Sequence, residues 1–250
     1  MLAIDLSGKT ALVTGGGQGL GAATAWMLAQ AGANVVVNYF ADREGVNRRR
    51  AHQTAERIGE RAVAMEADVR NLRQVEAMID QTMHRFGRLD IVVNNAGIVR
   101  DRTLKKLSPD DWQAVIDTNL TGVYHVCKAS GERLSEGGRI VNLASISAFA
   151  GFFGQSNYAA AKAGIVGLTR VLSRELAKRR ITVNAVAPGV VMTEMGNTIP
   201  EQQRAEMLKS IPLSRFGEPE EVAGVILFLS SELASYVTGQ VIHVNGGWWG

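Results

Sequence analysis

The sequence contains few of the residues that mark several common classes of protein. It has one cysteine, Cys127, which excludes an internal disulfide bond and fits a reducing compartment, so we expect a cytoplasmic protein. Its four histidines are scattered, with no pair at metal-ligand spacing, so we expect no zinc site. No apolar run approaches the about 20 residues of a membrane-spanning helix, and we expect no targeting segment at the N-terminus.

Net charge is also low. The formal charge is +3 at pH 7, which gives no electrostatic case for nucleic acid or an anionic membrane as a partner. By contrast, 46% of the residues are hydrophobic, and this is ample for a buried core in a chain of 250 residues. We therefore expect a small molecule as the main partner.

Short apolar runs rich in β-branched residues alternate with helical patterns along the chain. We predict strands at residues 9–14, 34–40, 62–66, 89–93, 138–143, 181–187 and 241–244. This alternation predicts a Rossmann-type α/β fold, a doubly wound parallel sheet of about seven strands with helices on both faces. We predict one domain over residues 1–250, in which the long connection at 190–212 acts as a lid.

A glycine-rich turn, Gly-Gly-Gly-Gln-Gly-Leu-Gly, follows the first predicted strand and leads into a helix. In this geometry the backbone N–H groups at the helix N-terminus face a phosphate, and glycine allows its close approach. The candidate contacts are Gly15, Gln18, Gly19, Leu20 and Gly21. Glycine turns also occur for conformational reasons alone, and that alternative stays open. The missing Gly-Lys-Ser/Thr ending disfavours a kinase or an ATPase.

The end of the second predicted strand bears on the choice of cofactor. A site for NAD usually has an acidic side chain there to bind the ribose 2′-hydroxyl, but this chain has Asn38, Tyr39 and Phe40. Without a carboxylate to repel a 2′-phosphate, and with Arg43 close behind, NADP(H) is favoured over NAD(H). Asp42 is the nearest acid, and we interpret it as the N-cap of the next helix.

The third and fourth predicted strands end in further candidate contacts. Asp68 and Val69 follow the third strand, where an adenine would lie. The fourth strand runs into Asn-Asn-Ala-Gly, whose last three residues are Asn95, Ala96 and Gly97. Small and amide residues suit a tight turn and a cofactor contact about equally, so both interpretations stand.

An asparagine interrupts the helix that begins near residue 109. Ser108 as cap and Pro109 at the first position predict the start of this helix. Asn119 lies in its middle, where asparagine has poor helix propensity and competes with the backbone for hydrogen bonds. We expect Asn119 to hold an ordered water or to distort the helix locally.

The strongest chemical signal is a tyrosine and a lysine four positions apart. Tyr158 and Lys162 would share one face of a helix, where a cation favours phenolate and lowers the pKa of the tyrosine. Tyr124 and Lys128 form a second such pair and show how weak the spacing is alone. The first pair differs because Ser145, thirteen positions before Tyr158, lies at a predicted strand end.

Taken together, these motifs resemble those of the short-chain dehydrogenase/reductase family along essentially the whole chain. The matching elements are Thr14-Gly-Gly-Gly-Gln-Gly-Leu-Gly21, Asp68, Asn94-Asn-Ala-Gly97, Asn119, Ser145, Tyr158-Ala-Ala-Ala-Lys162, and Pro188-Gly189 with Thr193. The subgroup that the chain is most similar to comprises 3-oxoacyl-acyl-carrier-protein reductases and related alcohol and sugar dehydrogenases. The resemblance implies a hydride transfer between a nicotinamide and a ketone or secondary alcohol, and a homotetramer.

The resemblance also implies roles for individual residues. Tyr158 would be the general acid in reduction and the base in oxidation, and Ser145 would hydrogen-bond the substrate oxygen. Lys162 would tune Tyr158 and bind the nicotinamide ribose, and Asn119 would hold a water that connects Lys162 to solvent.

The last implied contacts lie beyond the sixth predicted strand. Val191 and Thr193, after Pro188 and Gly189, would meet the nicotinamide carboxamide. Gln18 departs from the pattern, because NADP-using relatives often have a basic residue in the glycine loop. A second departure is the acidic stretch Ser-Glu-Gly-Gly before the serine strand, where carrier-protein reductases tend to be basic. An apolar pocket wall, core packing and a subunit contact explain a further set of residues about equally well: Phe149, Phe152, Phe153, Met192, Met195 and Trp249.

Other functions remain as alternatives. A sugar or alcohol dehydrogenase that uses NAD shares every motif. A non-catalytic dinucleotide sensor would have lost Tyr158, Lys162 or Ser145, and all three are present. A nucleotide-binding methyltransferase would share the glycine turn but gives no reason for the Asn119, Ser145, Tyr158 and Lys162 set.

Overall fold

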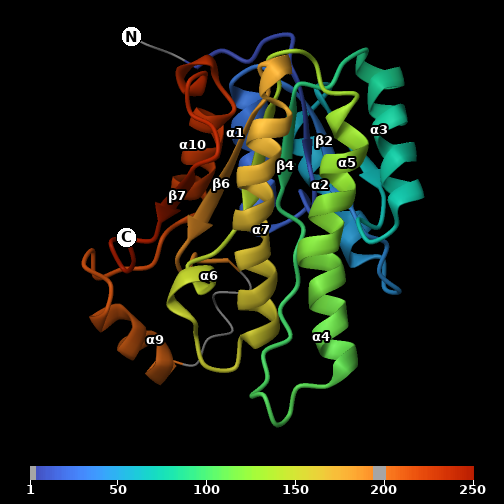
Figure 1. The fold of residues 1–250 in the computed structure, drawn as a ribbon. Coiled ribbons are helices and arrows are strands. Elements are labelled where there is room, and N and C mark those ends of the chain that lie inside the picture. The colour runs from blue at the N-terminus through green and yellow to red at the C-terminus, as the bar shows by residue number, and fades with distance from the viewer. Residues whose placement is uncertain (1–3, 194–200) are drawn as a thin grey trace.

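The computed structural model describes residues 4–193 and 201–250 and contains one seven-stranded parallel sheet (Figure 1). The strands are β1 (Thr10–Val13), β2 (Asn34–Tyr39), β3 (Ala62–Glu66), β4 (Ile91–Asn94), β5 (Arg139–Leu143), β6 (Thr182–Pro188) and β7 (Val241–Val244). Their order is β3-β2-β1-β4-β5-β6-β7, so the chain reverses direction across the sheet between β1 and β4. Each predicted strand is present, within one or two residues of its predicted bounds, and the predicted fold class is confirmed.

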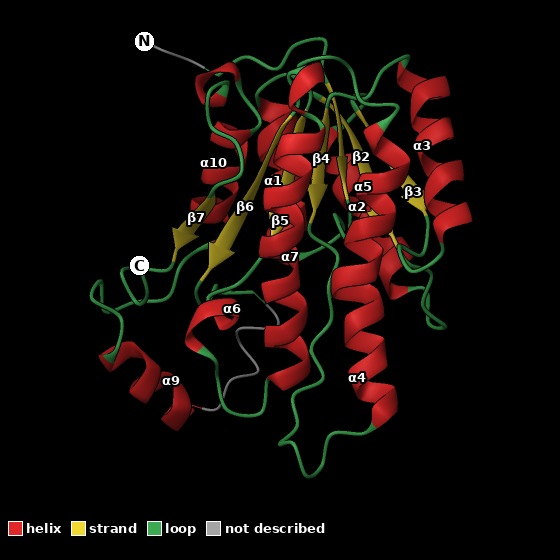
Figure 2. Cartoon of the chain, in the orientation of Figure 1, coloured by secondary structure: helices red, strands yellow, loops and turns green. Residues whose placement is uncertain are grey.

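Helices cover both faces of the sheet (Figure 2). They are α1 (Gly19–Gln30), α2 (Val46–Ile58), α3 (Leu72–Phe86), α4 (Pro109–Ile116), α5 (Gly122–Gly131), α6 (Ser147–Ala150), α7 (Ser156–Glu175), α9 (Glu201–Lys209) and α10 (Pro219–Leu229). Residues of α3, α5 and α7 build the core on one face, and residues of α1, α2 and α10 build the core on the other.

The valine-rich strands explain why two separate cores form. Val36 belongs to the core under α3, α5 and α7, whereas its neighbours Val35 and Val37 belong to the core under α1, α2 and α10. All three side chains are fully buried. Alternate residues of a strand point to opposite faces, so a strand covered on both faces must be apolar throughout.

The local signals around α4 also had the predicted effect. Ser108 accepts a hydrogen bond from the backbone N–H of Asp111, and Pro109 occupies the first turn. Asn119 lies in a π-helical turn, Asp117–Thr121, between α4 and α5. The expected helix distortion at Asn119 is therefore confirmed.

The long connection after β6 is only partly described. Its predicted lid spans 190–212, of which residues 194–200, including Met195, lie outside the described residues. The described remainder contains α9, and Met207 of α9 lines the cavity discussed below. Within residues 4–193 and 201–250, none of the helices has both the length and the apolar character needed to traverse a bilayer.

Candidate active site

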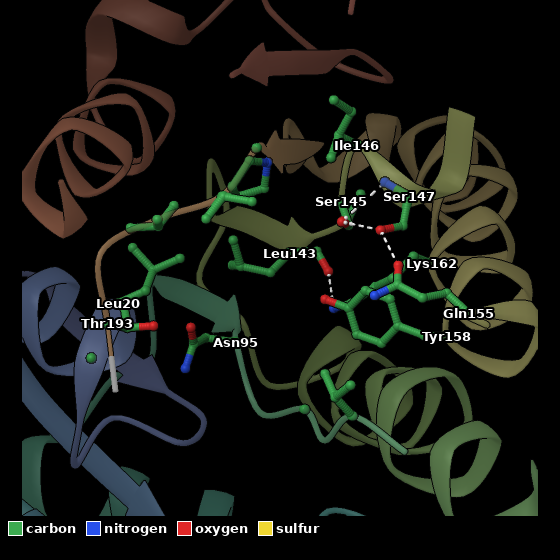
Figure 3. A pocket seen from close by; sticks show the side chains of 18 of the residues that line it. Leu20, Asn95, Leu143, Ser145, Ile146, Ser147, Gln155, Tyr158, Lys162 and Thr193 are labelled. Atoms are coloured by element: carbon green, nitrogen blue, oxygen red, sulfur yellow. Dashed lines mark hydrogen bonds between the residues drawn. The ribbon is translucent and has the colours of Figure 1, made fainter. Parts of the chain in front are cut away.

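A cavity of about 530 Å³ opens at the carboxyl ends of the strands. It lies beside the β1–β4 reversal, which is where ligands bind in open parallel sheets. The predicted site residues that line it are Gly15, Gln18, Gly19, Leu20, Gly21, Asn95, Ala96, Gly97, Ser145, Tyr158, Lys162, Pro188, Gly189, Val191 and Thr193. Figure 3 shows the side chains of several of these residues facing one another across the cavity.

One wall of the cavity is the glycine turn, locked to the end of β4. Thr14 Oγ1 accepts hydrogen bonds from the backbone N–H groups of Asn95 and Ala96, at 2.9 and 3.0 Å. In return, Asn95 Nδ2 donates to the carbonyl oxygens of Thr14 and Gly15. These bonds cross the strand reversal, so the turn after β1 and the turn after β4 form one rigid unit.

The glycines of this turn leave no room for side chains. A Cβ on Gly21 would lie 2.5 Å from Asn95 Nδ2 and still closer to the carbonyl oxygen of Gly15. Gly15 has a φ of +61°, and a Cβ there would lie 3.1 Å from the Cα of Ala96. Gln18 precedes α1 without a side-chain capping bond. The start of α1 is therefore a bare backbone cradle of the kind that holds a dinucleotide pyrophosphate.

The opposite wall carries the predicted catalytic side chains. Ser145 follows β5 and is 9% exposed, and Tyr158 and Lys162 lie in the first two turns of α7. Lys162 is buried, and its Nζ donates a hydrogen bond of 2.5 Å to the carbonyl oxygen of Leu143, the last residue of β5. The same Nζ atom lies 5.6 Å from the ring centroid of Tyr158. This bond fixes α7 against β5 and so brings Tyr158 to the same side as Ser145.

The prediction that Lys162 lowers the pKa of Tyr158 is wrong. Burial raises the pKa of Tyr158 to about 12, although a hydrogen bond from Ser145 opposes the rise. Burial likewise lowers the pKa of Lys162 to about 8. Loss of hydration disfavours both charged forms, and it outweighs the attraction between ammonium and phenolate. Tyr158 therefore holds its proton at neutral pH, as a proton donor must.

The second tyrosine–lysine pair confirms that spacing alone does not make a site. Lys128 Nζ lies 5.8 Å from the ring centroid of Tyr124, nearly the same distance as in the cavity pair. Tyr124 is 45% exposed, however, and neither residue lines the cavity. The location of the helix face, and not the spacing, separates the two pairs.

Asn119 supports the cavity without lining it. Its Oδ1 accepts from the backbone N–H of Ile98 at 2.8 Å, and its Nδ2 donates to the Ile98 carbonyl at 2.9 Å. The side chain thus pins the loop after β4 through both of its polar atoms. The water-holding role implied for Asn119 stays a prediction.

Replacing Asn119 by leucine is expected to lower the free energy of unfolding by about 3 kcal/mol, since the N–H and the carbonyl of Ile98 would lose their partner inside the protein. Urea denaturation measures this change. Gln113→Leu removes an exposed amide from the same helical segment and should change stability by less than about 0.5 kcal/mol. Equal losses in the two variants would contradict the pinning role.

Several predicted cofactor contacts are placed differently. Asn38 is buried, and its side chain accepts from the N–H of Gly15 and donates to the carbonyls of Tyr39, Met65 and Ala67. It supports the glycine turn from beneath, because its polar atoms are used inside the protein. The direct cofactor contact of Asn38 stays a prediction.

Other predicted contacts also lie off the cavity wall. Tyr39 is buried except for 7% of its surface, and Val69 packs in the core. The carboxylate of Asp68 forms an ion pair with Arg70 at 2.6 Å. Arg43 is exposed beyond the end of β2. These four residues and Asn119 are absent from the lining of the cavity, although an adenosine reaching past its edge would approach β2 and β3.

The pocket wall is partly as predicted. Phe152 and Phe153 line the cavity, but Phe149 packs edge-on against His243, with ring centroids 4.7 Å apart. Trp248 lines the cavity in place of its neighbour Trp249, which is 45% exposed, and Met192 is not among the lining residues. Lining residues that were not predicted include Asp101, Ser147, Gln155 and Trp248, whereas Met207 belongs to the predicted lid. No sequence motif marks Asp101, but Gln155 lies only three positions before Tyr158.

Known proteins match this chain over nearly its whole length. Residues 15–249 match the family described as enoyl-(acyl carrier protein) reductase. The chain is 45% identical to a 3-oxoacyl-[acyl-carrier-protein] reductase of Staphylococcus aureus over 244 residues, which cover 96% of this chain and 97% of that protein. It is also 45% identical to the 3-oxoacyl-[acyl-carrier-protein] reductase of a Synechocystis species, with 97% of each chain covered.

Solved structures agree with these sequence matches. A Brucella melitensis protein described as a short-chain dehydrogenase/reductase and glucose/ribitol dehydrogenase superimposes with a TM-score of 0.93, at 37% identity and full coverage of both chains. A dehydrogenase/reductase from Sinorhizobium meliloti gives a TM-score of 0.92 at 36% identity, covering 99% of this chain and 98% of that one.

Proposed function

Because the chain belongs to the short-chain dehydrogenase/reductase family, whose members are NAD(P)-dependent oxidoreductases, we propose that it reduces the ketone of a 3-oxoacyl thioester to a secondary alcohol. One observation carries the proposal. Ser145, Tyr158 and Lys162 line one wall of the cavity, and the glycine turn that fits a dinucleotide pyrophosphate lines the other. Relatives at 45% identity that are named 3-oxoacyl reductases support this choice of substrate.

The protein groups would act on the carbonyl oxygen of the substrate. Bound NAD(P)H supplies the hydride that reduces the carbonyl carbon. When the substrate binds, the Ser145 hydroxyl turns its hydrogen from Ser147 Oγ to the carbonyl oxygen and orients it, and Tyr158 donates its phenolic proton to the same oxygen. The raised pKa of Tyr158 suits this direction, since the phenol is protonated before the reaction. We propose that Lys162, whose pKa is lowered to about 8 and whose Nζ lies 5.6 Å from the ring centroid of Tyr158, then returns a proton to Tyr158.

A direct assay tests the function. Purified protein is mixed with NADPH and acetoacetyl-coenzyme A, and the loss of NADPH absorbance is compared with the formation of the 3-hydroxyacyl thioester. We expect one hydroxy product for each NADPH oxidised. Binding of NADPH without any reduction of this thioester or of simple ketones would contradict the proposal. Oxidation of polyols with NAD in place of this reaction would favour the sugar dehydrogenase alternative.

We propose that NADPH is the preferred cofactor, and Arg50 supports this choice. Helix α2 packs directly on the glycine turn, where a Cβ on Gly17 would lie 2.9 Å from the backbone nitrogen of Ala51. Arg50, one residue earlier, donates from Nη1 to Oε1 of Gln18. A cation thus reaches the position in the glycine turn at which the sequence lacks one.

Asp42 supports the same preference. Its two carboxylate oxygens accept hydrogen bonds from the backbone N–H groups of Val46 and Asn47, at 3.0 and 2.8 Å. Asp42 therefore satisfies the first N–H groups of α2, but the predicted N-cap position is wrong, because Gly45 occupies it. A carboxylate used in this way is poorly placed to select the 2′-hydroxyl of NAD.

Replacing Arg50 by methionine, which keeps the length of the side chain but removes its charge, should weaken NADPH binding by about tenfold, or about 1.4 kcal/mol, and leave NADH binding unchanged. Quenching of tryptophan fluorescence measures both dissociation constants. Arg49→Met is the matched control, because Arg49 donates to the Glu44 carbonyl on the surface. A wild-type preference for NADH, or an equal loss for both cofactors, would count against the role of Arg50.

We propose that the substrate thioester need not be delivered by a carrier protein docking at Arg133, Arg179 and Arg180, the basic residues near the amino ends of β5 and β6. Arg133 forms an ion pair with Asp80 at 2.9 Å, and Arg180 forms one with Glu136 at 3.1 Å. Arg179 donates to the carbonyls of Gly131 and Leu134. These cations lie near the amino end of β5, at the sheet edge opposite the cavity.

Assembly, location and the lid are part of the same proposal. We propose a cytoplasmic homotetramer whose contacts use the outer faces of α4, α5 and α7 and the edge strand β7. In support, these helices expose Trp112, Tyr124 and Val171, which are 39%, 45% and 53% accessible.

The lid at 190–212 remains a proposal, supported by the contribution of Val190, Val191, Thr193 and Met207 to the cavity wall.

A further inference from the structure

One charged side chain in the cavity wall takes no part in the proposed chemistry. Asp101 lines the cavity, in the connection between β4 and α4. Its Oδ2 accepts a hydrogen bond of 2.7 Å from Gln155 Nε2. Its Oδ1 is buried and has no hydrogen-bond partner within residues 4–193 and 201–250, and the described ion pairs do not include Asp101. Among the described residues, the Asp101 carboxylate therefore has a neutral amide as its side-chain partner and no cation to balance its charge.

Hydrogen bonds place this charge at the reacting end of the cavity. Gln155 Oε1 accepts from Ser147 Oγ at 2.8 Å, and Ser147 Oγ accepts from Ser145 Oγ at 3.2 Å (Figure 3). A carboxylate can only accept, so Gln155 must turn its amide nitrogen to Asp101 and its oxygen to Ser147. Asp101 is thus the fixed end of a chain of bonds whose other end is Ser145.

The loop that carries Asp101 is fixed on both sides. The backbone N–H of Arg102 donates to the carbonyl of Gly154 at 2.9 Å, and Asn157 Nδ2 donates to the carbonyl of Arg100 at 3.1 Å. The two anchors are Gly154, just before α7, and Asn157, the second residue of α7 itself. They fix the backbone on either side of Asp101, and the hydrogen bond to its Oδ2 holds its side chain in the cavity wall.

The remaining charge in the wall does not neutralise Asp101. Among the described lining residues, Lys162 is the one cation, and it is bonded to the Leu143 carbonyl and faces the Tyr158 ring. Besides burial, the charge of Asp101 contributes to the raised pKa of Tyr158, which shows that its field reaches the reacting group. A second negative charge in this space would be repelled through a medium that screens far less than water.

We propose that Asp101 is a specificity-determining residue that excludes substrates with a free carboxylate next to the reacting ketone. The enzyme would accept 3-oxoacyl thioesters, esters and amides, in which the acyl group is neutral. It would exclude the corresponding 3-oxo acids, in which that group is a carboxylate anion. This inference rests on the proposed function, and it deepens it by stating why the acyl group must be bound to sulfur, oxygen or nitrogen. The reaction that supplies the substrate must then form a thioester or ester before the ketone is reduced.

Two small substrates of nearly the same shape test the proposal. Acetoacetamide is neutral and acetoacetate is an anion, and both carry the reacting ketone. We expect the wild-type ratio of kcat/KM, amide over acid, to fall by about tenfold in Asp101→Asn, mainly through a gain with acetoacetate. The comparison of one ratio between two proteins cancels the difference in intrinsic reactivity of the two ketones. Asparagine keeps the shape of the side chain and still accepts from Gln155.

Binding provides a second readout that is independent of turnover. With NADP⁺ bound, quenching of tryptophan fluorescence, to which Trp248 in the cavity wall contributes, gives the dissociation constants of both compounds. Asp101→Asn should tighten acetoacetate binding by about tenfold and leave acetoacetamide within about twofold. Asp110→Asn is the matched control, since Asp110 is exposed in the first turn of α4 and does not line the cavity.

The outcomes distinguish a failure of the role of Asp101 from a failure of the proposed function. Equal ratios in wild type and Asp101→Asn, with acetoacetamide reduced normally, would overturn the role of Asp101 and leave the proposed function standing. The same change in Asp110→Asn would show a general surface-charge effect and would also overturn it. If wild type reduces other ketones but neither binds nor reduces either acetoacetyl compound, the proposed 3-oxoacyl substrate fails, and the inference fails with it.

Discussion

Tyr158→Phe is expected to lower kcat by about a thousandfold while NADPH binds with nearly unchanged affinity. The phenol is the group that we propose donates its proton to the substrate oxygen, and burial raises its pKa to about 12, so it is protonated at neutral pH. General acid catalysis typically contributes about 10²–10⁴ in rate, and phenylalanine removes the proton without altering the ring. Stopped-flow measurement of NADPH oxidation gives the chemical step, and fluorescence titration gives the affinity.

Tyr124→Phe is the matched control for this experiment. Tyr124 has its own lysine four positions later, at almost the same distance from its ring, but it lies on an exposed helix face. Its removal should leave kcat within about twofold of wild type. If both variants lost activity equally, or if neither did, Tyr158 could not be the acid.

Gly21→Ala is expected to abolish dinucleotide binding and to lower the free energy of unfolding by about 3 kcal/mol or more. The added Cβ would meet the Gly15 carbonyl oxygen, which is backbone, and Asn95 Nδ2, which two hydrogen bonds hold in place. Relief requires the turn after β1 to move away from the turn after β4, which breaks the bonds of Thr14 and Asn95 that define the cradle. Urea denaturation and NADPH titration measure the two effects.

Gly167→Ala shows whether this loss is specific. Gly167 is also a helical glycine, in α7, and no atom lies within 4 Å of an added Cβ. Alanine there should stabilise the protein by about 0.5–1 kcal/mol through helix propensity, without a change in NADPH affinity. Equal destabilisation of the two variants would mean that the crowding at Gly21 is not the cause.

The fold was predictable because its signals are local. The valine-rich strands, the cap formed by Ser108 and Pro109, and the poor fit of Asn119 in a helix each depend on a few neighbouring residues. The walls of the site followed from the fold, since parallel strands end at one edge and gather Gly15, Asn95, Ser145 and Pro188 there. A local pattern and a topological rule were sufficient for both.

The failures concern interactions between segments far apart in the chain. The hydrogen-bond partners of Asn38 could not be predicted, because they come from the glycine turn and from the end of β3, and no local pattern reports them. Arg50 reaches Gln18 across 32 positions for a similar reason. The pKa of Tyr158 could not be predicted either, because spacing reveals the nearby cation but not the loss of water around the phenol.

The bond from Lys162 to the Leu143 carbonyl has a consequence for how such an enzyme can diversify. It joins a helix to a strand through backbone and one buried side chain, so the distance between Ser145 and Tyr158 is set by the scaffold. Asp101, Phe153 and Met207, which line other parts of the cavity, lie on loops or on α9 outside this pairing. Mutations in those segments can therefore exchange one substrate for another while the proton-transfer geometry is inherited unchanged.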